Sequence, residues 1–101
     1  MTLVPFHQII SNDLRDPEFV AIYLEECLAA DMSSFRVGLR EVVRANGGMS
    51  QLAEKTGLSR ESLYRTLSEQ GNPEFRTIQL ILAALGLRIA IARGEELAAA
   101  A

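Results

Sequence analysis

Apolar residues recur at every third or fourth position through most of the chain, which is the spacing of the buried face of an α-helix. This pattern predicts helices over about residues 16–30, 33–46 and 74–86. Asp16 is a suitable N-cap for the first helix, and Pro17 suits its first helical position. The expected inward-facing residues are Phe19, Val20, Tyr23, Leu24, Cys27 and Leu28 in the first helix, Phe35, Leu39, Val42 and Val43 in the second, and Ile78, Ile81, Leu82 and Leu85 in the last.

Residues 49–68 predict two shorter helices joined by a tight turn. Gly57 can adopt the positive φ that ends a helix, Leu58 can fill the turn, and Ser59 can cap the next helix through its hydroxyl. A small residue, a glycine, an apolar residue, a cap and an amphipathic helix, in this order, are typical of a DNA-binding helix-turn-helix. An ordinary helical hairpin is the alternative. The expected inward-facing residues are Met49, Leu52, Ala53, Leu63 and Leu67.

The period changes after Gly86. Leu87, Ile89 and Ile91 alternate with Arg or Ala, which is the pattern of a strand over residues 87–93. A single strand cannot satisfy its own backbone groups, and the sequence offers no second strand. We therefore expect antiparallel pairing with the same strand of a second chain, which would make a homodimer. A continuation of the preceding helix is the alternative.

These elements predict an all-α domain with five helices around one core, followed by a short C-terminal strand that pairs across a dimer. We expect a loose N-terminal arm over residues 1–15, with Leu14 among the apolar residues available to pack, the helical domain over 16–86, the dimerisation strand over 87–93 and a frayed end over 94–101. A length of 101 residues suits one such domain. No apolar run approaches the roughly 20 residues of a membrane span, and no secretion signal is evident, so we expect no membrane association and a cytoplasmic location.

Charge is distributed unevenly, although the net formal charge is only −3. Residues 1–32 carry six acidic residues and one arginine, whereas residues 33–94 carry nine basic and five acidic residues. The positive charge therefore lies in the part of the chain that contains the predicted helix-turn-helix. Arg36, Arg40 and Arg44 recur every fourth residue and predict a basic stripe, either a solvated face or a surface for phosphate or an acidic partner.

Nothing in the sequence predicts catalysis. His7 is the single histidine and Cys27 the single cysteine, so no cluster with metal-ligand spacing is possible from these residues. No glycine-rich phosphate loop is present, since Gly47-Gly48 is too short and follows a helix. We expect Cys27 to be a small buried hydrophobe, and we expect no enzymatic activity, no metal and no cofactor.

In the DNA-binding interpretation, the second short helix presents the face opposite Leu63 and Leu67. An arginine can bind guanine in a bidentate manner, and a glutamate can accept a hydrogen bond from cytosine. Serine hydroxyls and residues early in the flanking helices can contact phosphates. The expected DNA-binding residues are Gln51, Ser59, Arg60, Glu61, Ser62, Tyr64, Arg65, Asn72 and Arg76.

Three segments carry a resemblance to a known family: DPEFVAIYLEECLAAD, GMSQLAEKTGLSRESLYRTLS and GNPEFRTIQLILAALGLRI, and the resemblance extends over roughly residues 16–92. The chain resembles the HigA-like antitoxins, the antidote subunits of bacterial addiction modules, which have a Cro/repressor-type (Xre) helix-turn-helix. The resemblance implies a lambda-repressor-like fold with its recognition helix at residues 59–68. Glu74 departs from the pattern, because a Ser, Thr or Asp would cap the last helix better.

The resemblance also implies a function. Such an antitoxin neutralises a toxin similar to the RelE/HigB messenger-RNA interferases, and it represses its own operon by binding operator DNA as a dimer. A toxin that binds RNA should be basic, so the acidic first helix offers candidate contacts at Tyr23, Glu25 and Glu26. Two alternatives are a solitary or phage-type repressor without a toxin partner, and a helical adaptor whose helix-turn-helix packs against protein.

Overall fold

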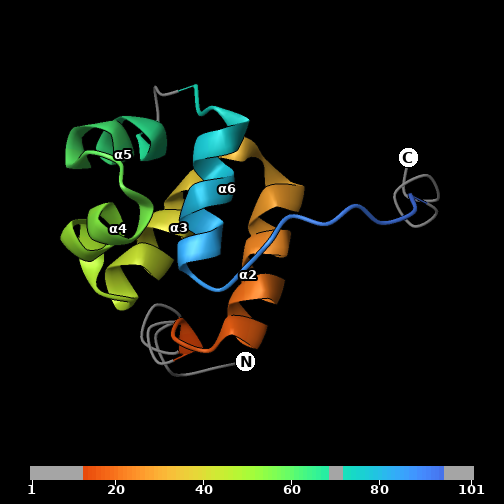
Figure 1. Cartoon of the computed structure of the whole chain (residues 1–101). Helices are drawn as coiled ribbons and strands as arrows, with labels where there is room; N and C mark the ends of the chain where they lie inside the picture. Colours follow the sequence, from red (N-terminus) through yellow and green to blue (C-terminus); the bar gives the residue numbers. More distant parts are fainter. Residues whose placement is uncertain (1–12, 69–71, 95–101) are drawn as a thin grey trace.

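The computed structural model describes residues 13–68 and 72–94, and every regular element within them is an α-helix (Figure 1). The all-α class and the five predicted helices agree with this arrangement. No helix among the described residues is long and apolar enough to cross a membrane. The bounds of the helices are Pro17–Ala30 for α2, Met32–Ala45 for α3, Gly48–Thr56 for α4, Arg60–Leu67 for α5 and Phe75–Ala84 for α6.

Two aspartates set the start of α2 and of α3. The carboxylate of Asp16 accepts a hydrogen bond from the Glu18 amide at 3.1 Å, and Pro17 occupies the first helical position, as predicted. Asp31 ends α2 and also caps α3, since its carboxylate accepts from the Ser34 amide at 2.6 Å. This shared cap explains why α3 begins at Met32, slightly earlier than the predicted serines.

The connection between α4 and α5 is the tight turn that the sequence predicts. Gly57 has a φ of +77°, and its amide donates to the Ala53 carbonyl at 2.9 Å. The hydroxyl of Ser59 accepts from the Ser62 amide at 3.0 Å and caps α5. Thr56, which the sequence did not single out, links the two halves because its hydroxyl accepts from the Leu58 amide at 3.2 Å.

The last helix begins without a side-chain cap at Glu74, as the departure from the family pattern suggested. It ends in a Schellman motif, in which the Leu87 amide donates to the Leu82 carbonyl at 2.8 Å and the Gly86 amide donates to the Ala83 carbonyl at 3.0 Å. Gly86 has a φ of +81°. Residues 87–94 then run on without helix or strand, so the alternative of a continued helix is wrong. The predicted pairing of residues 87–93 with a second chain stays a prediction.

The core lies where α3 packs against α2, α4 and α5, with α6 closing the far side of α4. Residues 13–16 are fixed to the end of α3, because the Asn46 side chain donates to the Leu14 carbonyl at 2.8 Å and Leu14 itself is buried. The buried apolar residues are Leu14, Val20, Leu24, Phe35, Leu39, Val42, Val43, Leu52, Leu63, Leu67, Ile78, Ile81 and Leu82.

Two predictions about side-chain direction, those for Leu28 and Arg36, are wrong. Leu28 was expected to face inward, but it is 51% exposed because it lies at the edge of a hollow between α2 and α6. Arg36 was expected on a basic surface stripe, but it is buried in α3, a helix that packs against α2, α4 and α5. Arg44 is exposed and pairs with Glu41 at 3.2 Å. The arginines of α3 therefore do not form one continuous basic surface. Cys27 is only half-buried, not fully buried.

Candidate nucleic-acid interface

The outward face of α5 carries four exposed side chains. Leu63 and Leu67 are fully buried, which fixes the rotation of this helix and turns its other side to solvent. Tyr64 is 53% exposed although it is a large aromatic residue. The exposed face that the sequence predicted consists of Arg60, Glu61, Tyr64 and Arg65.

The charges on this face remain accessible. Arg65 and Glu61 approach to 4.0 Å, but their side chains are 68% and 86% exposed. A pair this exposed is weak, because water screens it and both side chains are flexible. The two side chains can therefore separate and reorganise on a partner at little cost. Ser59 is exposed, whereas Ser62 is half-buried and its amide is engaged by the cap.

The other predicted DNA contacts lie on neighbouring elements. Gln51 is exposed on α4, and its side-chain amide lies directly against Gly47. Asn72 and Arg76 are exposed before and within the first turn of α6. Because only four residue steps separate Ser68 from Asn72, those two positions lie within about 14 Å of each other. The start of α6 is thus tethered close to the end of α5, as Figure 1 also shows.

The three candidate toxin contacts on α2 differ in their accessibility. Glu25 and Glu26 are exposed, whereas Tyr23 is partly buried between α2 and α3. Its ring stacks on Phe19 with the centroids 6.2 Å apart. Burial is the main cause that raises the pKa of Tyr23 to about 12, and the neighbouring Cys27 adds to it. Burial also raises the pKa of the Cys27 thiol. Tyr23 therefore belongs largely to the packing of α2 on α3.

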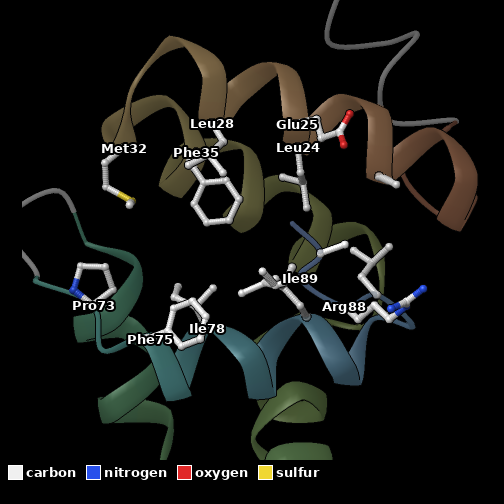
Figure 2. A pocket seen from close by; sticks show the side chains of 14 residues that line it. Leu24, Glu25, Leu28, Met32, Phe35, Pro73, Phe75, Ile78, Arg88 and Ile89 are labelled. Carbon is white, nitrogen blue, oxygen red and sulfur yellow. The ribbon is translucent and has the colours of Figure 1, made fainter. Parts of the chain in front are cut away.

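A hollow between α2 and α6, here called the α2–α6 groove, is the feature that sequence reasoning missed. Its volume is about 400 Å³, and Figure 2 shows apolar side chains from both helices pointing into it. Glu25 and Arg88 are its charged lining residues. The apolar lining includes Leu24, Leu28, Met32, Phe35, Phe75, Ile78, Leu87 and Ile89. The exposed Leu28 and Phe75 signal it only once the helices are placed, because helical periodicity alone puts Leu28 inside.

The predicted dimerisation residues lie in the tail that borders this groove. Leu87 is half-buried, Ile89 is 39% exposed and Ile91 is 98% exposed.

The described residues contain no group of three potential metal ligands.

Comparison with known proteins shows which family the chain belongs to. A protein of Haemophilus influenzae (strain Rd), described as an uncharacterized protein, is 36% identical over 83 residues, which is 81% of this chain and 84% of that relative. No solved structure matches the chain. The family model of probable addiction module antidote proteins matches residues 4–93, which is most of the chain. The chain therefore belongs to the family of probable addiction module antidote proteins.

Proposed function

We propose that this protein is the antitoxin of a type II toxin–antitoxin module, and that it acts as a homodimer with two activities. It neutralises a small, basic RelE/HigB-like toxin by binding it, and it represses its own operon by binding operator DNA. Membership of an antidote family supports the toxin partner. The observation that carries the DNA-binding half is the exposed polar face of α5 behind a rigid, capped turn.

In this proposal α5 is the recognition helix and α4 supports it. The helix N-terminus points backbone amides and Ser59 toward a phosphate, while Arg60 and Glu61 in the first turn lie nearest the base edges. Arg65, one turn further on, reads a base or holds a phosphate. The turn can hold α5 in this orientation because Gly57 and Ser59 satisfy the helix ends locally.

The flanking positions would fix the register on the duplex. Gln51 near the start of α4, and Asn72 and Arg76 at the start of α6, are exposed at positions from which polar side chains contact the sugar–phosphate backbone. Such contacts position the protein and carry most of the salt-dependent affinity, but they do not read the sequence.

The toxin-binding half would use acidic surface and no catalytic chemistry. Glu25 and Glu26 are exposed on α2 and would face basic groups of a toxin that binds RNA. Tyr23 would contribute only the edge that its packing leaves accessible. Neutralisation in this scheme is stoichiometric occlusion, so the protein needs no cofactor or metal and acts in the cytoplasm, where its toxin acts.

The DNA-binding half is tested by titrating the protein against a duplex from the promoter of its own operon over a series of salt concentrations. Affinity should fall steeply with salt, since each neutralised phosphate adds roughly 0.9 to the slope of log K against log salt. A shuffled duplex is the control and should bind more weakly at every salt concentration. Equal and salt-independent binding to both duplexes would contradict the proposal and favour an adaptor that packs against protein.

A further inference from the structure

Ile91 is the most exposed apolar residue of the tail. Ile91 is 98% exposed, in a segment without helix or strand whose preceding residues Leu87 and Ile89 line the α2–α6 groove. The tail is therefore an extended segment with apolar side chains along one edge. Leu87 and Ile89 of this edge contact the groove of the same chain, whereas Ile91 does not. The unpaired backbone groups of such a segment can form hydrogen bonds with a strand of another chain.

The groove is incompletely filled from within the same chain. Leu28 is 51% exposed, Met32 45% and Phe75 65%, although all three line a hollow of about 400 Å³. In Figure 2 the side chains of α2 and α3 face those of α6 across an open space, with Ile89 at its edge. Apolar side chains arranged in this way are unfavourable in water, which favours a partner that covers them.

We propose that the α2–α6 groove receives the tail of a second copy of this chain, with Ile91 of the partner subunit as the side chain that enters it. The inference rests on the homodimer of the proposed function and adds where the partner's tail docks. The two tails form an antiparallel pair on the molecular two-fold axis, and each Ile91 packs into the groove of the other copy.

The sequence of the tail selects one register for this pair. Antiparallel pairing centred on Ile89 places Leu87 opposite Ile91 of the partner subunit, so that every apolar residue of the edge meets another. Because Leu87 lines the groove, Ile91 of the partner subunit is then delivered to it. Centring the pair on Arg88 would oppose two like charges, and centring it on Ala90 would set Leu87 against Arg93 of the partner subunit.

The exposed apolar area comes close to the area that a small dimer buries. Each copy offers five large side chains, namely Leu28, Met32, Phe75, Ile89 and Ile91. At roughly 100 Å² each they supply on the order of 500 Å² per copy. With the backbone of the paired tails, this approaches the roughly 600 Å² per partner found at the lower limit of specific interfaces.

Single substitutions at exposed positions test the groove by sedimentation of the full chain without toxin or DNA. Ile91→Ser on the tail and Leu28→Ser in the groove should each raise the dimer dissociation constant about tenfold or more, since both remove apolar contacts at the centre of the interface. Ile22→Ser is the matched control, because Ile22 is 62% exposed on α2 and does not line the groove, and it should leave the constant unchanged. Circular dichroism of each variant checks that the fold is retained.

The outcomes separate this inference from the dimer itself. If Ile91→Ser weakens the dimer while Leu28→Ser and Phe75→Ser do not, the tails pair but the groove is not the docking site, and the inference is overturned while the proposed dimer stands. If deleting residues 87–92 leaves the dimer intact, the homodimer stands but the tails do not form it, and the inference is overturned. If proteins with substitutions in the groove still form the dimer but no longer bind the toxin, the groove is the binding site of the toxin, and the inference is again overturned.

Crosslinking tests the register directly. In a Cys27→Ser background the chain has no native cysteine, so Ile89→Cys introduces a single thiol at the proposed two-fold axis. Oxidation should link nearly all of this variant into a covalent dimer, because directly opposed strand residues lie within disulfide range. Arg88→Cys and Ala90→Cys should link poorly. A stronger yield at either of these positions would overturn the proposed register.

Discussion

At the scale of single residues, Arg60 and Arg65 carry the specificity of the proposed recognition helix. Replacing either with Ala should weaken specific operator binding by about 1–3 kcal/mol and leave the fold intact, since both side chains are exposed. Fluorescence anisotropy with the operator duplex measures the loss, and circular dichroism checks the fold.

Arg65→Lys is the matched control for this prediction. It keeps the charge but loses the bidentate geometry, so it should weaken binding to the operator more than binding to a shuffled duplex. Unchanged operator affinity in both alanine variants would show that α5 does not bind in the major groove of the DNA.

The turn between α4 and α5 depends on the backbone freedom of Gly57. Its φ is +77°, and nothing lies within 4 Å of where a Cβ would be, so Gly57→Ala tests backbone strain alone. We expect a loss of about 1 kcal/mol in the free energy of unfolding, measured by urea denaturation. Gly57→Asn should cost clearly less, because asparagine tolerates this conformation. Equal losses in the two variants would contradict this explanation.

Tyr23 should titrate well above an exposed tyrosine. Burial raises its pKa from 10.0 to about 12, so the neutral phenol stabilises the folded state below pH 10, and this contribution is lost as the pH rises toward 12. In a Tyr64→Phe variant Tyr23 is the one tyrosine left, and the phenolate absorbance then reports it alone. A midpoint near 10 in the folded protein would mean that Tyr23 is not held between α2 and α3.

At the scale of elements, α2 and α3 approach closely at Gly38. A Cβ at this position would lie 2.8 Å from the Cys27 sulfur, so Gly38→Ala should destabilise the protein despite a gain of about 1 kcal/mol in helix propensity. In a Cys27→Ala background the nearest remaining atom is Cε2 of Tyr23 at 3.3 Å, and the same substitution should become neutral or stabilising. Urea denaturation of the four proteins in this cycle measures the coupling. Additive effects of the two substitutions would show that the contact between position 38 and Cys27 does not limit how closely α2 and α3 approach.

The helices could be predicted from the sequence because their ends are determined locally. Asp16 with Pro17, Gly57 with Ser59, and Gly86 each act on backbone groups within about four residues. The outward face of α5 follows in the same way, since burying Leu63 and Leu67 decides which residues face solvent. The exposed side chains proposed to contact DNA could therefore be predicted from the sequence alone.

Features that depend on a third element could not be predicted in this way. Leu28 has the spacing of a core residue, but it faces the groove because α2 and α6 do not close over it. Arg36 has the spacing of a surface stripe, but α3 is surrounded by other helices, so its long aliphatic stem is buried. Periodicity reports one helix at a time, whereas a groove is a property of several.

At the scale of the whole molecule, the uneven charge fits two partners of opposite sign. The chain up to residue 32 carries six acidic residues and one arginine, while α4 and α5 lie in the part with more basic residues. An acidic surface suits a basic toxin, and a basic one suits DNA. The proposed dimer would present two copies of α5, as a two-fold symmetric operator requires. Membership of an antidote family implies the toxin partner, whereas the DNA partner is a proposal for experiment.

Growth of cells that express the reading frame adjacent to this gene tests the antitoxin role, because the proposed function predicts that this frame encodes the toxin. Co-expression of the wild-type protein should restore growth, and the Arg60→Ala/Arg65→Ala variant should restore it equally, because the proposed function assigns toxin capture to α2 and not to α5. Failure of the wild-type protein, produced in soluble form, to restore growth in the presence of the toxin would contradict the antitoxin role.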